Sequence, residues 1–274
     1  MPSLDHVTMK DYHDVYEPSD DTYLLLDGIL LGFQSNENIN NHSDSFTALE
    51  IGCGTGIPIV YLGLQQQTQQ QQQRFQQQHG GGGGSACDVM TLLATDCNPH
   101  ALRVAQATAT VHGLDLTTHQ CDLASALLSS SSSSLPGDLS TDVEIEEEGC
   151  YWDGSIDMLL FNPPYVPTPD EEVVDFNGNG NTSTKCDGSF ENRVVGIEAS
   201  WAGGLHGRRV IDRAIPQIAR LLRKTTGVAY MITVDDNLPE QLGHELENLG
   251  LRMEPWVRRR ARNEYLTVQR ITWI

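Results

Sequence analysis

The chain has 274 residues, of which 39% are hydrophobic, enough for a folded core of one or two domains. Its formal net charge of −20 repels phosphate backbones and therefore disfavours direct nucleic-acid binding. The sequence shows no signal-peptide core, no apolar run long enough to span a bilayer and no C-x-x-C pair, so we expect a cytoplasmic or nuclear protein with reduced thiols and no metal site.

Apolar segments of helical and strand character alternate along the chain. The expected elements, in chain order, are a helix over 22–31, a strand over 46–51, a helix over 57–64, a strand over 89–95, a helix over 99–112 capped by Asn98 or Asp96, a strand over 116–119, a short helix over 123–128, a strand over 156–161, a helix over 208–223, a strand over 227–233, a helix over 238–249 and a hairpin of strands over 251–257 and 265–271. This order predicts a single α/β domain over 1–274 with a doubly wound, seven-stranded, mostly parallel, Rossmann-like sheet. Ligands of such sheets bind beyond the carboxyl ends of the strands.

Three polar segments interrupt this pattern and read as inserts. They are a glutamine and glycine tract over 65–85, a serine run followed by an acidic cluster over 129–148, and a segment rich in glycine and asparagine over 171–192. Each lacks the apolar periodicity needed to offset the entropy of ordering, so we expect disordered surface loops.

A glycine-rich turn follows the first strand, where Glu50 precedes Gly52 and Gly54. Glycines let a ligand approach the backbone closely, although any tight strand-to-helix turn also uses them. Asp96 ends the second strand 44 residues after Gly52, and removing the 21-residue tract leaves 23, near the spacing of about 20 expected for a carboxylate that binds ribose hydroxyls. A dinucleotide dehydrogenase fits less well, because Glu50 would repel a pyrophosphate. S-adenosyl-L-methionine carries an amino cation and a sulfonium, so we expect it as the cofactor.

Asp122 and Leu123 follow the third strand. In this architecture the Asp122 carboxylate is placed to accept from the exocyclic amine of adenine, and Leu123 to pack on the ring. A plain helix N-cap at Asp122 is an equally good interpretation of the spacing.

The sequence Asn162-Pro163-Pro164-Tyr165 directly follows the fourth strand. The Asn162 side-chain oxygen and the Pro163 carbonyl can accept the two N–H bonds of a planar amide or amine, which turns its lone pair towards a methyl donor. Two prolines hold this backbone rigid, and Tyr165 can stack on the flat acceptor. We therefore expect a nitrogen methyltransferase, with a strand that simply ends in a proline turn as the alternative.

With both motifs placed, the sequence resembles the HemK family of glutamine methyltransferases, and more closely its eukaryotic release-factor branch. The resemblance rests on residues 15–23, 50–56, 161–166 and 196–208. It implies N5-methylation of the glutamine in the Gly-Gly-Gln loop of a class-1 translation release factor, with histone lysine as a further substrate of some members. It also implies a small zinc-binding activator protein as partner in a heterodimer, paired with the sheet edge near the third strand.

The resemblance implies a role for each matching residue. Thr22, Glu50, Gly52, Gly54, Asp96, Asp122, Leu123 and Asn162 would bind the cofactor, while Asn162, Pro163, Pro164 and Tyr165 would bind the substrate. The segment 16–18 would fold over the site.

Two other functions remain open at this point. An adenine-N6 methyltransferase would act on a similar planar amine, and Arg258, Arg259, Arg260 and Arg262 form its one candidate basic patch, although a solvated face is the simpler interpretation. A non-catalytic scaffold would keep the fold but would not need Asn162.

Overall fold

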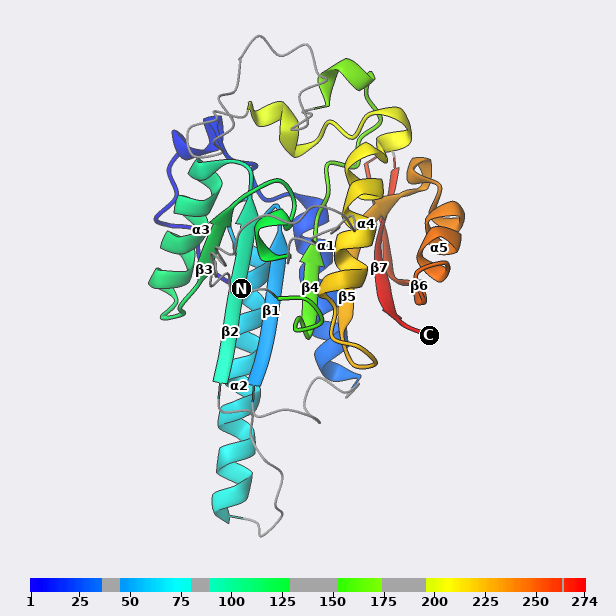
Figure 1. Ribbon diagram of the computed structural model, residues 1–274. Helices are drawn as coiled ribbons and strands as arrows, with labels where there is room; N and C mark the ends of the chain where they lie inside the picture. The colour runs from blue at the N-terminus through cyan, green and yellow to red at the C-terminus, as the bar shows by residue number, and fades with distance from the viewer. Residues whose placement is uncertain (36–44, 80–88, 129–151, 174–195, 263) are drawn as a thin grey trace, which may run out of the picture.

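The computed structural model describes residues 1–35, 45–79, 89–128, 152–173, 196–262 and 264–274, and its centre is one seven-stranded sheet. The strand order is β3-β2-β1-β4-β5-β7-β6, and β7 runs antiparallel to both of its neighbours (Figure 1). The strands are β1 Ser45–Ile51, β2 Val89–Asp96, β3 Thr117–Gln120, β4 Met158–Phe161, β5 Val228–Val234, β6 Leu251–Ala261 and β7 Glu264–Trp273. The predicted seven-stranded, mostly parallel sheet is therefore confirmed.

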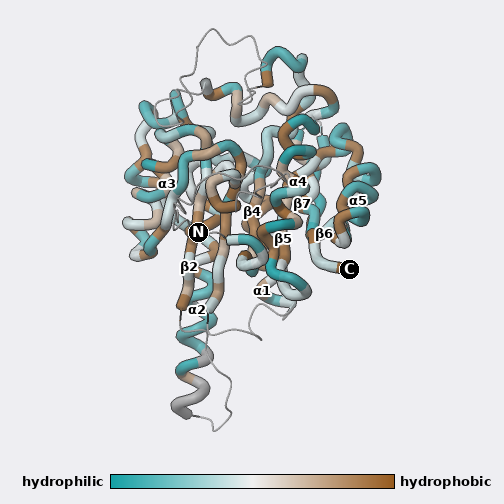
Figure 2. Tube along the Cα trace, in the orientation of Figure 1, coloured by the Kyte–Doolittle hydropathy of each residue, from teal (hydrophilic) through white to brown (hydrophobic). Residues whose placement is uncertain are grey.

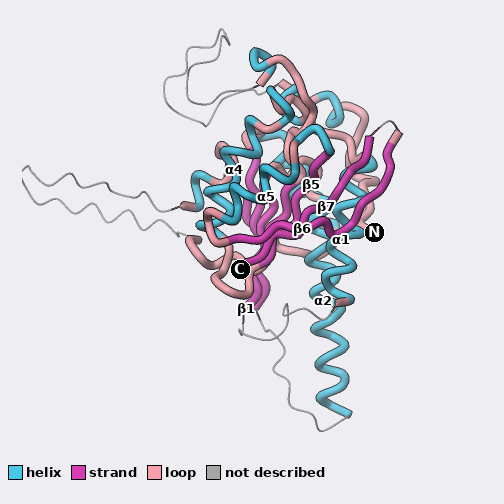
Figure 3. Tube along the Cα trace, turned by 90° about the vertical axis from the view of Figure 1, so that its right-hand side faces the viewer, coloured by secondary structure: helices cyan, strands magenta, loops and turns pink. Residues whose placement is uncertain are grey.

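Helices cover both faces of the sheet (Figures 1 and 3). The α-helices are α1 Asp20–Gln34, α2 Ile57–His79, α3 Pro99–Val111, α4 Arg209–Leu221 and α5 Pro239–Glu247. Short 3-10 helices are η1 Asp11–His13, η2 Ser125–Leu127, η3 Asp170–Glu172, η5 Ile197–Ser200, η6 Leu205–Gly207 and η7 Asp235–Asn237. One large hydrophobic cluster joins α1 and α2 to the sheet, and a second joins α4 and α5 to its other face.

The central strands are buried on both sides, which explains their continuous apolar runs. Along β1, Ala48 packs in the cluster of α1 and α2, whereas Leu49 and Ile51 pack in the cluster of α4 and α5. In β4, Leu160 packs in the cluster of α1 and α2, and Phe161 packs in the cluster of α4 and α5. This alternation is what a parallel strand between two helical layers requires, and Figure 2 shows the hydrophobic colour concentrated along β4 and β5.

The glutamine tract departs from the sequence prediction. Helix α2 does not end at Leu64 but continues through the glutamines to His79, so residues 65–79 of the predicted loop over 65–85 are helical, and residues 80–85 lie outside the described residues. Glutamine is a good helix former, and no glycine or proline occurs between Leu64 and His79 to stop the helix. The extended helix projects away from the sheet (Figures 1 and 3), and Figure 2 shows that much of its projecting half is hydrophilic.

Other differences are smaller. The helix predicted over 123–128 is a single 3-10 turn, η2, because the segment is too short for a stable α-helix. The insert over 129–148 lies outside the described residues, and of the insert over 171–192 the structure describes 171–173, mostly the end of η3. Within the described ranges, no helix combines the length and the apolar character that crossing a membrane demands.

Candidate active site

The site lies where two neighbouring parallel strands end. Strand β1 pairs with β4, and the last register partners are Ile51 and Phe161. Gly52 and Asn162 therefore follow the ends of two neighbouring strands, which in a β-sheet lie about 4.7–4.9 Å apart. Both residues line one cavity, beyond the carboxyl ends of the strands, where a ligand is expected in such a sheet.

This cavity encloses about 1150 Å³ of empty volume, including its part open to solvent. Pockets that bind small molecules or cofactors commonly have volumes of about 300–1000 Å³. The predicted site residues that line it are Thr22, Glu50, Gly52, Gly54, Asp96, Asp122, Leu123, Asn162 and Pro164. The cavity is also lined by residues that the sequence does not assign to the site, among them Asn98, Cys97, Ser200, Val210 and Arg213. Of these, the sequence predicts Asn98 only as a helix cap.

The glycine turn leaves room for a ligand. Gly52 and Gly54 have φ angles of +65° and +50°, which side-chain-bearing residues rarely adopt. A Cβ atom added at either position would meet no atom within 4 Å. The turn therefore presents bare backbone to the cavity.

Glu50 lies beneath this turn and is fully buried. One of its carboxylate oxygens accepts a hydrogen bond from the backbone N–H of Ile59, in the first turn of α2, at 3.0 Å. Burial nevertheless raises the pKa of the Glu50 carboxyl well above its usual range. A cationic ligand in the cavity would favour the charged carboxylate and would be bound by it in return.

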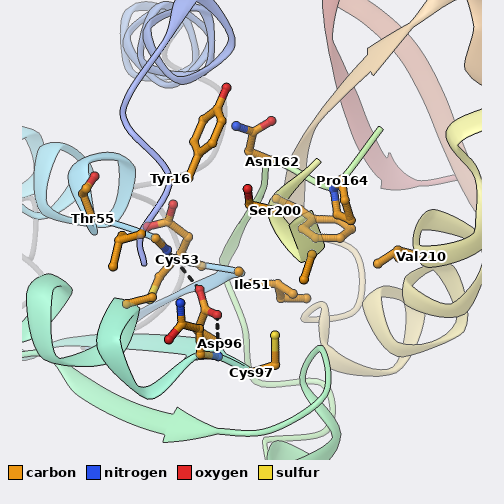
Figure 4. A pocket seen from close by; sticks show the side chains of 18 of the residues that line it. Tyr16, Ile51, Cys53, Thr55, Asp96, Cys97, Asn162, Pro164, Ser200 and Val210 are labelled. Atoms are coloured by element: carbon orange, nitrogen blue, oxygen red, sulfur yellow. Dashed lines mark hydrogen bonds between the residues drawn. The ribbon is translucent and has the colours of Figure 1, made fainter. Parts of the chain in front are cut away.

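Asp96, at the end of β2, is held by two backbone N–H groups. Its oxygens accept from Gly54 at 3.1 Å and from Asn98 at 2.9 Å (dashed lines in Figure 4). Burial raises the pKa of its carboxyl as well. A carboxylate oxygen has more than one acceptor site, so each can still accept from a ribose hydroxyl of a ligand.

At the end of β3, Asp122 accepts a hydrogen bond from the Arg213 guanidinium, which α4 supplies. Leu123 has a φ angle of +54°, an uncommon conformation for a residue with a branched side chain. Such strained backbone often marks ligand sites. The open glycine backbone, the carboxylates of Glu50 and Asp96 and this apolar corner together fit an amino-acid cation, a ribose and an adenine, the parts of S-adenosylmethionine.

The acceptor side of the cavity is formed by Asn162 and Pro164, with Tyr16 close to Asn162 (Figure 4). The Asn162 side-chain oxygen is buried and has no hydrogen-bond partner among the described residues. An unpaired buried acceptor costs about 1–3 kcal/mol, so it is poised to accept an N–H group from a ligand.

Pro163 and Tyr165 are not among the residues that line the cavity. The Tyr165 hydroxyl instead donates to the carboxylate of Asp21, at 3.1 Å. The backbone carbonyl of Tyr165 accepts a hydrogen bond from the side-chain amide of Asn237. The same amide also donates to the backbone carbonyl of His206. Sequence reasoning missed Asp21 and Asn237, because contacts across 144 and 72 residues leave no local pattern.

The loop over 196–208 packs closely against the motif. A Cβ atom on Gly207, whose φ angle is +66°, would collide with the Tyr165 carbonyl oxygen. Glycine is therefore required where the chain crosses the residues after Asn162, which gives a physical reason for this glycine-rich stretch.

The arginine cluster is partly neutralised by its surroundings. Arg258 pairs with Asp235, and Arg259 pairs with Asp27. These ion pairs favour the interpretation as a solvated face over a nucleic-acid patch.

Comparison with known proteins gives relatives but no matching family model. The chain is 29% identical over 271 residues to Methyltransferase HEMK2 of Mus musculus, covering 99% of this chain and 95% of the relative. It is 25% identical over 270 residues to the eRF1 methyltransferase catalytic subunit mtq2 of Schizosaccharomyces pombe, covering 98% and 94%. Among solved structures, the E. cuniculi Mtq2-Trm112 complex aligns with a TM-score of 0.49 and 21% identity, covering 95% of this chain and 99% of that one. The likeness to the two sequence relatives extends over nearly their whole length.

Proposed function

We propose that the chain is a HemK-type S-adenosylmethionine-dependent methyltransferase that methylates the N5 atom of a glutamine side chain in a class-1 translation release factor. The observation that carries the proposal is the buried oxygen of Asn162, which has no hydrogen-bond partner among the described residues and lines the same cavity as the Gly52 turn. The eRF1 substrate named for the Schizosaccharomyces relative supports the same choice of target.

The cofactor side of the cavity would hold the methyl donor. When bound, S-adenosylmethionine supplies a methyl group on a cationic sulfur. Glu50 would face its positive charge, Gly52 and Gly54 would admit it against bare backbone, and Asp96 would accept from its ribose. Asp122 and Leu123 would contact the adenine, and Thr22 the methionine end.

The acceptor side would hold a planar amide. Asn162 would accept one N–H bond through its side chain, and Pro163 the other through its carbonyl, so that the nitrogen lone pair points at the methyl group. Such positioning can supply roughly 7–11 kcal/mol of the barrier reduction, and the proton can leave after transfer without a dedicated base. Pro164 lines the cavity, while Tyr165 would act through its contacts with neighbouring elements rather than by stacking.

A partner subunit is part of the proposal. Strand β3 is at the edge of the sheet, and its residues Thr117–Gln120 are only partly buried, so its open side can pair with another chain. The Schizosaccharomyces relative is itself named a catalytic subunit. We therefore expect a small zinc-binding activator protein to bind along this edge of the sheet. We also expect the enzyme to be cytoplasmic, in the same compartment as the release factor.

The test is transfer of a labelled methyl group after co-expression with and without the activator. We expect label on the release factor but not on a variant whose Gly-Gly-Gln glutamine is alanine, and we expect none with the enzyme variant Asn162→Ala. Label on DNA or RNA instead would support the adenine-N6 alternative. Unchanged transfer by Asn162→Ala would contradict the assignment of the site.

A further inference from the structure

A buried carboxylate joins the two sides of the cavity. Asp21 lies in the first turn of α1 and is 3% exposed. One of its oxygens accepts from the Tyr16 hydroxyl at 3.0 Å and from the Tyr165 hydroxyl at 3.1 Å. The other accepts from the backbone N–H of Thr22 at 2.6 Å and from its hydroxyl at 3.3 Å.

The two tyrosines come from distant parts of the chain. Tyr16 belongs to the N-terminal segment over 14–18, which lines the cavity and lies beside Asn162 (Figure 4). Tyr165 comes three residues after Asn162 and directly after Pro164. One carboxylate oxygen therefore ties the segment that covers the donor to the motif that grips the acceptor.

We propose that Asp21 is a positioning residue for methyl transfer, which fixes the Asn-Pro-Pro-Tyr motif relative to the N-terminal segment through the hydroxyls of Tyr16 and Tyr165. This inference rests on the proposed function, because it concerns the same cavity. Asp21 acts through the two tyrosines and does not itself line the cavity.

Both side-chain oxygens of Asp21 serve as acceptors. The four groups that hydrogen-bond to them all donate. An asparagine would place its N–H₂ group against either the Thr22 N–H or the tyrosine hydroxyls. Burial raises the pKa of Tyr16 and of Tyr165, with the Asp21 charge adding to the effect, so both hydroxyls keep their protons and remain donors.

The first experiment compares Asp21→Asn with Asp20→Asn, a matched change at the exposed neighbouring position in the same turn. We expect Asp21→Asn to lower the single-turnover rate by about ten- to a hundredfold, as misplacement of reacting groups does, while Asp20→Asn matches the wild type. The expected loss is in kcat, with the KM for the release factor largely kept. A rate for Asp21→Asn equal to the wild-type rate overturns the proposal.

A double-mutant cycle separates positioning from general destabilisation. In the background Tyr16→Phe with Tyr165→Phe, both hydroxyl contacts are already absent, so Asp21→Asn should cause little further loss of rate. An undiminished loss in that background would mean that Asp21 is merely structural, and the proposal would fail.

Hydrogen exchange gives a readout that does not need the substrate. Asp21→Asn should accelerate backbone amide exchange both in 14–17 and at Tyr165 and Val166, whereas Tyr16→Phe should accelerate it mainly in 14–17. If the wild type fails to methylate the release factor but Asp21→Asn loosens both segments, the proposed substrate is wrong, and the link that Asp21 makes between the two segments stands. If neither segment loosens, the link itself is wrong.

Discussion

The side chain of Asn98 holds two parts of the cofactor side together, because its amide N–H₂ donates to the Asp14 carbonyl at 2.6 Å while its oxygen caps α3. Asp14 is the first residue of the N-terminal segment that lines the cavity. A residue that the sequence indicates only as a helix cap thus also fixes one wall of the ligand site.

Two changes at Asn98 should separate these roles. Asn98→Ala removes the cap and should lower the free energy of unfolding by about 1 kcal/mol, whereas Asn98→Asp keeps an oxygen for the cap and should remain near wild-type stability. Both remove the donor to Asp14, so both should weaken binding of S-adenosylhomocysteine. Urea unfolding and calorimetry measure the two effects, and Asn98→Asp with wild-type affinity would show that the N-terminal segment needs no such anchor.

Asp96→Ala should weaken cofactor binding strongly. A hydrogen bond to a charged group contributes about 1.5–3 kcal/mol, so loss of both ribose contacts would reduce affinity by a few kcal/mol. The variant also leaves the N–H groups of Gly54 and Asn98 without their acceptor, which disturbs the glycine turn. Calorimetric titration with S-adenosylhomocysteine is the measurement, and an unchanged affinity would refute the role given to Asp96.

Glu50→Gln should stabilise the ligand-free enzyme at neutral pH. Because burial raises the folded-state pKa of Glu50, the folded state binds more protons than the unfolded state above about pH 4.3, the usual glutamate value. The contribution of Glu50 to stability is therefore complete below that pH and is lost as pH rises through the folded pKa. Glutamine keeps an oxygen for the Ile59 N–H and has no such titration.

The expected result is a higher melting temperature for Glu50→Gln at pH 7–8, by about 2–4 °C for each kcal/mol recovered, and no difference near pH 4. The same variant should bind both S-adenosylmethionine and S-adenosylhomocysteine more weakly than the wild type does, because both ligands carry the amino-acid ammonium group. Melting curves across the pH range test the first part. A variant less stable than the wild type at neutral pH would mean that the Glu50 charge is already compensated in the fold.

The sheet could be predicted from the sequence because its signals are local. Apolar runs such as the one that ends at Phe161 mark strands by composition and length, and the motif after it marks the edge of the sheet where ligands bind. The sequence alone is therefore enough to place Gly52 and Asn162 in one crevice. The contacts of Tyr165 with Asp21 and Asn237 could not be predicted, because hydrogen bonds between distant segments depend on the finished packing.

The glutamine tract differs from the prediction for another reason. Its low complexity predicts an absence of structure, yet Gln66 is 1% exposed and belongs to α2. Helix propensity and attachment to an already packed helix outweigh the lack of an amphipathic pattern there.

Two deletions test where the packed part of α2 ends. Removing residues 71–84 should leave the melting temperature nearly unchanged, because Gln71 and Gln72 are exposed and shortening a surface connection alters loop closure little. Removing residues 66–84 also takes away the buried Gln66 and should lower the melting temperature. Differential scanning calorimetry compares the two, and equal melting temperatures would place the boundary back at Leu64.

The pairing of Ile51 with Phe161 makes the spacing of the two strand ends a property of the backbone ladder. Substitutions can remove or tilt a side chain in the cavity, but the strands that lead to Gly52 and Asn162 stay neighbours at the repeat of a β-sheet. Long polar segments elsewhere in the chain can therefore change in length or composition without moving these two strand ends apart.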